Sequence, residues 1–220
     1  LTLIEFPLIS VQIVPLKIQY ISVIFFWVYI INVTNFVDGL DGLIASVSLG
    51  FFINLFTFLI LFQISSINTY ISFLMIPLLA SFFIFNKPKA RIFLNDVGSI
   101  PIGYIIGFCL LNLAYLNEWI IMLSLFFYFI FDVSITLFRK IKKGYYPWAR
   151  LFDYQFLQPV LKGGKNHSFV LKYIIIYYFL MILTIFFIFY LNLNKLVLLT
   201  YSIISSLYIF YKFDKFNLKN

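Results

Sequence analysis

The sequence predicts an all-α, multi-pass transmembrane helical bundle. Of its 220 residues, 63% are hydrophobic and only 11% are charged, and the mean hydropathy is +1.02. A soluble domain typically carries about 25% charged residues and hides its apolar side chains in one core. This chain has more apolar surface than one core can hold, so lipid must solvate most of it. The composition therefore points to a membrane partner, and no nucleic-acid partner is expected.

Seven apolar runs are each long enough for a helix that crosses the bilayer, which takes about 17–25 residues. They cover residues 18–36, 42–63, 69–85, 100–116, 119–138, 173–191 and 196–211. The first run is interrupted by polar residues, and the last is short. Residues 1–17, which include Pro7 and Pro15, are expected to form an irregular or re-entrant lead-in. Without a visible repeat or second domain, residues 1–220 are expected to form a single transmembrane domain.

The positive charges predict the orientation of the bundle. All but two of the 16 Lys and Arg residues lie in the loop 86–99, in the segment 139–172 or in the C-terminal tail. Seven alternating spans place these three regions on one side, and only Lys17 and Lys195 on the other. Cationic loops stay in the cytoplasm. We therefore expect an inner (cytoplasmic) membrane protein with a long basic cytoplasmic loop before its last two spans, and the turn 36–42 on that same face.

The first polar cluster, residues 35–43, reads Asn-Phe-Val-Asp-Gly-Leu-Asp-Gly-Leu and follows the first span. Carboxylates at the end of an apolar span are costly and usually functional. Asn35, Asp38 and Asp41 recur every three residues, so on a helix they would project from one side. Their oxygens suit Mg²⁺ or a magnesium-bound phosphate, and the glycine after each aspartate permits close approach to the backbone. A simple helix cap is the alternative, but the doubled Asp-Gly favours function.

The second polar cluster is the loop 86–99. Asp96 is its only acid and lies among three cations, and Gly98 and Ser99 open the next span. The N-terminus of that span would present free backbone N–H groups to anions. Asp96 is therefore either a site residue or a solvated ion-pair partner of the neighbouring cations.

The third polar cluster is the basic segment 139–172, which contains Arg150 and His167 and follows Asp132 in the fifth span. An intramembrane carboxylate indicates a site unless it pairs with a neighbouring polar group. The eight cations of the segment would also suit anionic lipid headgroups. A lone histidine such as His167 is more often structural than catalytic.

Together the three clusters resemble the polyprenyl-phosphate N-acetylhexosamine-1-phosphate transferases. That superfamily includes enzymes of O-antigen, enterobacterial common antigen and teichoic acid synthesis, and the phospho-N-acetylmuramoyl-pentapeptide transferase of peptidoglycan. Residues 35–43 match its Asn-Phe-x-Asp-Gly-x-Asp-Gly-x signature. Residues 93–99 match its Phe-Met-Gly-Asp-x-Gly-Ser loop with two substitutions, and Asp132 followed by Arg139 resembles its Asp and Arg before a basic loop.

The resemblance implies transfer of a sugar 1-phosphate from a UDP-N-acetyl sugar to polyprenyl phosphate, with release of UMP. It implies Mg²⁺ as the cofactor and a homodimer as one form of assembly. Three aspartates would be catalytic, and the last would also bind the metal: Asp38, Asp41 and Asp96. Three further residues would contact the donor: Asn35, Arg150 and His167.

The sequence departs from this family in two places. The family carries an upstream Asp-Asp motif, whereas Glu5 is the only acid before Asn32. We therefore expect the chain to be the C-terminal portion of a longer transferase fold and to be inactive alone. Ala149 and Phe152 also stand where the third motif of the family would have histidines.

Two other functions are weighed against this one. A cation-coupled transporter or a non-catalytic scaffold would use Asp38, Asp41 and Asp132, but a transporter site should lie near the middle of the membrane. Phosphotransferases that act on CDP-activated alcohols carry an Asp-Gly-x-x-Ala-Arg pattern, which residues 38–43 do not match.

Overall fold

The computed structural model describes residues 16–146 and 153–216, and within them the regular structure is helical throughout. The elements are α1 (Leu16–Val37), α2 (Leu43–Leu61), α3 (Ile67–Asn86), α4 (Asn95–Tyr115), α5 (Trp119–Leu125), α6 (Phe127–Lys142), a 3₁₀ turn (Gln155–Leu157), α7 (Gln158–Leu161), α8 (His167–Tyr190) and α9 (Leu196–Asp214). Six helices among the described residues are long and apolar enough to cross a membrane, and the count is seven if the bent pair α5–α6 is taken as one span. The predicted all-α, multi-pass bundle is confirmed.

Several helices extend beyond the apolar runs that predicted them. α4 begins at Asn95 rather than at residue 100, and α8 begins at His167 rather than at residue 173. α1 begins at Leu16, so the last two residues of the expected lead-in are helical, and residues 1–15 lie outside the described residues. A helix continues past the hydrocarbon because its backbone bonds do not depend on lipid. Asp96 of the second cluster and His167 of the third therefore lie in the first turns of helices.

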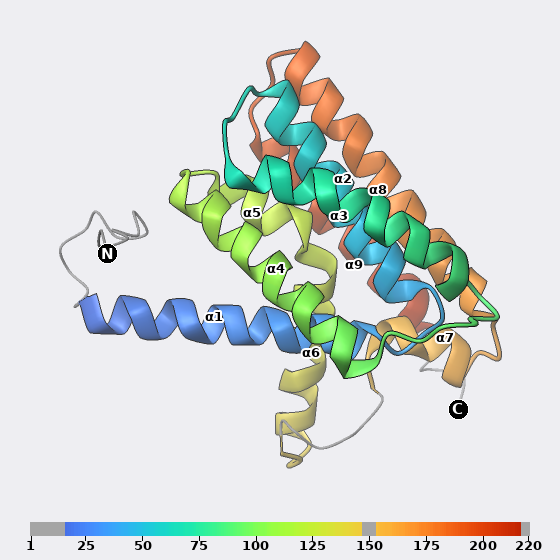
Figure 1. Cartoon of the computed structure of the whole chain (residues 1–220). Coiled ribbons are helices and arrows are strands. Elements are labelled where there is room, and N and C mark those ends of the chain that lie inside the picture. Colours follow the sequence, from blue (N-terminus) through green and yellow to red (C-terminus); the bar gives the residue numbers. More distant parts are fainter. Residues whose placement is uncertain (1–15, 147–152, 217–220) are drawn as a thin grey trace.

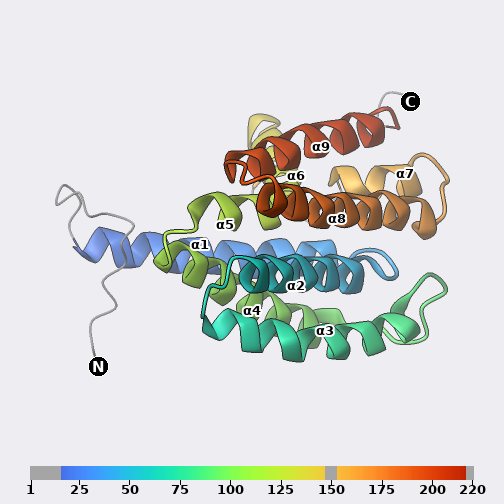
Figure 2. The same cartoon turned by 90° about the horizontal axis from the view of Figure 1, so that it is seen from above.

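α2 is the central helix of the bundle and lies between α3 and α8 (Figure 2). In the apolar 18-residue stretch of α2, 67% is buried inside the bundle, against 22% in that of α3. Gly50 of α2 has no side chain, so the ring of Tyr178 on α8 packs directly against the helix at this point. Asn54 adds a buried hydrogen bond from its Nδ2 to the carbonyl oxygen of Tyr178 (3.2 Å). This packing holds the start of α2 beside the start of α8.

α1 crosses α4 at two glycines (Figure 1). A Cβ on Gly103 would lie 2.9 Å from Cα of Ile31, and a Cβ on Gly107 would lie 2.4 Å from the ring of Trp27. Trp27 also donates from Nε1 to the carbonyl oxygen of Tyr104 (3.0 Å). Without side chains at the two glycines the helices approach closely, and the end of α1 lies beside the start of α4.

The fifth predicted span, 119–138, is broken rather than continuous. α5 and α6 meet at Phe126 with a bend of 68°. The Phe126 ring is fully buried and packs against Phe51 and Phe129. Residues 119–131, on both sides of Phe126, are apolar apart from Ser124, so the hydropathy there does not show the break. The bend directs α6 past α1 and α9, and its last part projects beyond α1 (Figure 1).

The bundle has two chemically different ends. At the basic end α1, α3, α6 and α9 finish and α2, α4 and α8 begin. All of the described cations except Lys17 and Lys195 lie at or near this end. At the opposite end Lys195 pairs with Glu118 (2.5 Å) and packs on Phe58 and Phe62. The fold therefore gathers the three polar clusters at one end, as the alternation of spans predicted.

Candidate functional site

The first cluster forms a helix end and a turn. α1 stops at Val37, the Asp38 backbone N–H donates to the Asn35 carbonyl oxygen (3.2 Å), and Gly42 has a φ of +74° before α2 begins. The expectation that Asn35, Asp38 and Asp41 share one helical face is wrong. Glycine readily adopts positive φ, so Gly42 ends this turn and starts α2 in a new direction.

A half-buried hydrogen bond joins the first cluster to the second. Ser99 is fully buried in the first turns of α4, and its Oγ donates to Oδ1 of Asn35 (2.8 Å). The carbonyl oxygen of Asn95 lies 3.0 Å from the same hydroxyl. The sequence placed these residues in separate motifs, and the crossing of α1 and α4 brings them together.

Asp38 lies beside the start of α4, near enough to Asp96 to feel its charge. The Asn95 backbone N–H and the negative charge of Asp96 both act on the Asp38 carboxylate. Asp38 is half-buried, whereas Asp96 is exposed in the first turn of α4. Burial raises the pKa of Asp38 to about 6; the Asn95 N–H opposes the shift and the charge of Asp96 adds to it. The fold thus brings together two of the three predicted catalytic aspartates.

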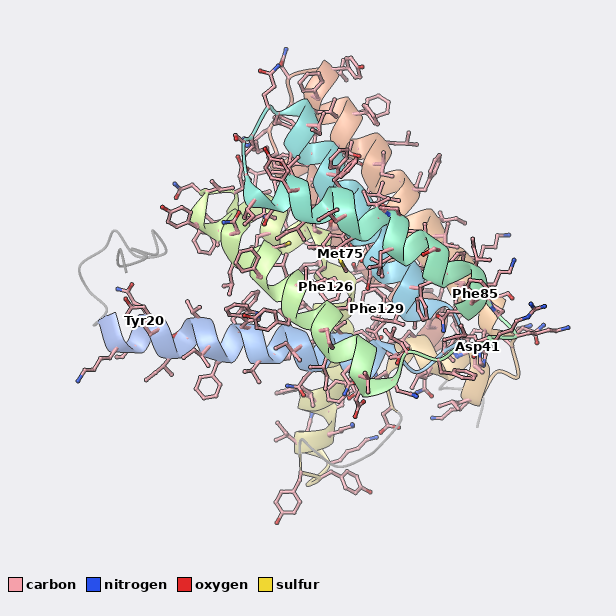
Figure 3. All side chains as sticks on the ribbon, in the orientation of Figure 1. Tyr20, Asp41, Met75, Phe85, Phe126 and Phe129 are labelled. Carbon is pink, nitrogen blue, oxygen red and sulfur yellow. The ribbon has the colours of Figure 1, made fainter. Side chains whose placement is uncertain are left out.

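Asp41 links the first cluster to both of the others. Its Oδ2 accepts hydrogen bonds from the backbone N–H groups of Lys89 (3.2 Å) and Ala90 (3.3 Å). The same oxygen lies 3.3 Å from Nδ1 of His167, and the Asp41 backbone N–H donates to that nitrogen (3.2 Å). Figure 3 shows Asp41 and Phe85 at the same end of the bundle, opposite Tyr20. The His167 ring is therefore held against the first cluster.

Sequence reasoning missed Asn86, the last residue of α3. Its side chain is 2% exposed, its Oδ1 accepts from the Gly42 backbone N–H (3.1 Å), and its Nδ2 donates to the Ile92 carbonyl oxygen (2.9 Å). Both amide groups are thus used to join the turn after α1 to the loop after α3. An amide at the end of an apolar span, just before Lys-Pro, was the available signal.

The remaining predicted residues are placed as follows. Arg150 lies outside the described residues, together with Ala149 and Phe152. Asp132 is fully buried in α6 and accepts hydrogen bonds from two backbone N–H groups. Of the two interpretations of Asp132, the structure shows pairing with neighbouring polar groups.

Cations surround this end of α3 without neutralising the acid of the second cluster. Within the described part of the chain, Asp96 forms no ion pair with the three cations of its loop. These cations, Lys87, Lys89 and Arg91, line a hollow of about 290 Å³ together with three apolar residues: Ile84, Phe85 and Pro88. In the second cluster the acid, Asp96, is therefore separate from the basic hollow.

The carboxylates of this site suit Mg²⁺ only if substrate phosphates and water supply the other ligands. Among the residues described, no three His, Cys, Asp or Glu side chains converge on one point. Proteins usually hold Mg²⁺ with one or two carboxylates while substrate phosphates and water supply the other ligands. Asp38 and Asp96 provide two mutually repelling carboxylates of this kind, so the residues present fit that mode of binding.

A bundle of apolar helices with carboxylates and cations gathered at one end defines a multi-pass membrane protein with a polar terminal site. The sequence profile of glycosyl transferase family 4 matches residues 1–114. The chain belongs to this family. The match covers both the turn that holds Asp38 and the start of α4 that holds Asp96.

The curated relatives come from bacteria. The chain is 32% identical over 145 residues to the phospho-N-acetylmuramoyl-pentapeptide-transferase of Streptococcus pyogenes serotype M49, which covers 63% of this chain and 42% of that protein. It is 39% identical over 83 residues to the enzyme of the same name from Leuconostoc mesenteroides, over 36% of this chain and 26% of that protein. The chain thus spans less than half the length of these relatives. No solved structure matches it.

The pKa of Asp38 provides a test of its environment. In magnesium-free protein we expect this carboxyl to titrate near pH 6 instead of its ordinary 3.8. The folded protein then holds the proton more tightly than the unfolded chain. The stability that this group contributes is complete below about pH 4 and is lost as the pH rises through 6. Infrared or ¹³C NMR titration of labelled aspartate measures the value.

The variant Asp96→Asn serves as the control for this titration. It removes one repelling charge, so the pKa of Asp38 should fall in the variant. An Asp38 pKa that does not respond to Asp96→Asn would show that the two carboxyl groups do not share a site.

Proposed function

We propose that the protein, as part of a complete transferase, transfers a sugar 1-phosphate of the N-acetylhexosamine type from a UDP-sugar to polyprenyl (undecaprenyl) phosphate and so initiates a cell-envelope polysaccharide. Membership of the family supports this function. The observation that carries it is the Ser99–Asn35 hydrogen bond, because it holds the turn of Asp38 against the helix of Asp96.

The proposed reaction exchanges one phosphoanhydride bond for another. An oxygen of the lipid phosphate attacks the phosphorus next to the sugar, the bond from that phosphorus to the bridging oxygen breaks, and UMP leaves with the electron pair. Little covalent chemistry falls to the protein, so positioning and charge stabilisation supply most of the rate. Both substrates are anionic and repel each other, which a basic site offsets.

The residues would divide this work between them. Asp38 and Asp96 would hold Mg²⁺, which when bound neutralises charge on the diphosphate. Asn35, held by Ser99, would line the donor cleft with Asp41. His167 is fixed through Nδ1, so its Nε2 is the nitrogen that would meet a donor phosphate. Arg150 is proposed as a second donor contact from the basic segment.

We further propose that the basic end faces the cytoplasm. Nearly all described cations lie at this end, and cationic segments are retained on the cytoplasmic side of a membrane. A lipid phosphate and a soluble nucleotide sugar would then meet at the interface, where the carboxylates and cations lie. The same arrangement disfavours a transporter, because Asp38, Asp41 and Asp96 lie at one end and Asp132 is bonded to backbone.

The function is tested with the complete parent protein in membranes. It is incubated with labelled UDP-N-acetylhexosamine, polyprenyl phosphate and Mg²⁺, and we expect a labelled lipid product together with one equivalent of UMP. Omission of polyprenyl phosphate or addition of a chelator should stop both products. A wild-type preparation that binds the donor but forms no lipid product would contradict the proposal.

A further inference from the structure

Asp132 makes its hydrogen bonds to a segment far away in the sequence. Its Oδ1 accepts from the Gln155 backbone N–H (3.0 Å) and its Oδ2 from the Phe156 N–H (3.1 Å), and Thr136 Oγ1 lies 3.4 Å from Oδ1. The two N–H groups open a 3₁₀ turn, where no preceding carbonyl can satisfy them. The carboxylate of α6 therefore caps a turn that belongs to the end of the basic segment.

A second carboxylate holds the same segment from α9. Gln155 Nε2 donates to Oδ1 of Asp214 (2.9 Å), and Arg139 of α6 lies 3.6 Å from that oxygen. The Arg139 guanidinium also lies over the ring of Phe210. Gln155 is thus anchored by its backbone to α6 and by its side chain to α9.

The anchored segment, residues 154–157, packs directly on the first cluster. The ring of Tyr154 stacks on that of Phe36 with centroids 5.3 Å apart. Leu157 lies so close to Gly39 that a Cβ on the glycine would be 3.2 Å from Leu157 Cδ2. Phe36 and Gly39 flank Asp38, so the position of segment 154–157 sets one wall of the turn that carries this aspartate.

We infer that Asp132 is a positioning residue, which with Asp214 holds segment 154–157 against the turn of Asp38. Asp132 does not reach the site itself, because both its oxygens are used inside the bundle. Its charge acts through the backbone of Gln155 and Phe156. The same anchor fixes the chain between the basic segment and α8, which carries His167. For catalysis the inference rests on the proposed function, but the packing it describes does not.

The test uses the complete parent protein with Asp132→Asn and Asp132→Leu. Hydrogen exchange without substrates should speed up in peptides that cover residues 153–161 and 35–42, and should not change in peptides from α3. The loss of one or two hydrogen bonds to a charged group predicts exchange faster by about 10–100-fold. Unchanged exchange in both regions would overturn the inference.

Kinetics give a second readout, which a general loss of folded protein would not produce. Because the segment sets one wall of the turn of Asp38 and holds the chain that leads to His167, kcat per folded enzyme should fall by about tenfold or more and KM for the UDP-sugar should rise. Asp132→Asn keeps one acceptor oxygen, so its kinetic effect should be smaller than that of Asp132→Leu. Unchanged kcat and KM per folded enzyme in both Asp132 variants would contradict a positioning role.

Two further variants complete the test, one as a substitute for the Asp132 variants and one as a control. If the Asp132 variants do not accumulate, Asp214→Ala removes the outer anchor, and it should raise exchange in the same two regions by a smaller factor. Asp153→Asn changes an acid next to the segment but not in either anchor, and it should change neither exchange nor KM. Inactive wild-type protein with the expected exchange pattern would reject the proposed function and support the inference. Active wild-type protein whose Asp132 variants lack that exchange pattern would support the proposed function and reject the inference.

Discussion

The variant Asp96→Asn should lose almost all transferase activity while it still folds and binds to membranes. Asp96 is exposed in the first turn of α4, so its side chain contributes little to packing. We propose that it is a ligand of Mg²⁺ beside Asp38. A metal that neutralises phosphate charge is worth several kcal/mol in the transition state, and each 1.36 kcal/mol is tenfold. We therefore expect kcat to fall by on the order of 10²–10³-fold, measured as UMP release.

Asp153→Asn is the matched control, because it removes a carboxylate from the same end of the bundle without touching the Asp38–Asp96 pair. It should keep near wild-type activity. If Asp96→Asn retained more than about a tenth of the activity at saturating Mg²⁺, the metal would have to be held elsewhere.

The second large effect is expected from Gly42→Ala, on stability. Gly42 has a φ of +74°, and a Cβ there would lie 2.8 Å from Leu171 Cδ2 and 3.2 Å from Cα of Lys87. Left-handed backbone costs an L-residue roughly 1–2 kcal/mol, and overpacking adds about 1–3 kcal/mol. We expect a loss of about 2–5 kcal/mol, seen as a lower unfolding midpoint in detergent.

Gly144 provides a control with the same backbone and no neighbours. Its φ is +79°, and nothing lies within 4 Å of the position of its Cβ. Gly144→Ala therefore carries only the backbone cost of about 1–2 kcal/mol. The difference between the two variants measures how tightly α8 and the loop after α3 close on the first cluster. Equal shifts of the two midpoints would mean that Leu171 gives way freely.

The candidate site was predictable where its chemistry is written in a short stretch of chain. Residues 35–43 and 93–99 carry their pattern in consecutive positions, and the helices of the fold then bring them together. The geometry within the first cluster was not predictable from its three-residue period, because Gly42 turns the chain where a helix would have continued.

The residues that hold the site together carried a weaker signal or none. Asn86 and Ser99 are single polar residues at helix ends, and their partners lie 44 and 64 positions away in the sequence. Asp132 was visible as a charge inside a span, but its two backbone partners were not, because any residue supplies a backbone N–H. Such partners are chosen by packing and not by residue type.

The sequence by itself determined the class of the fold, the approximate positions of its spans, the gathering of the cations at one end and the two motifs that indicate the family. These properties follow from hydrophobicity and charge along the chain, which the bilayer selects one segment at a time. Only the tertiary structure decided the bend at Phe126, the joining of Asp38 to Asp96, the fixing of His167 by Asp41 and the anchoring of residues 154–157 by Asp132. Those features depend on the direction and closeness of helix packing, because hydrogen bonds form only over short distances between groups that the fold has already aligned.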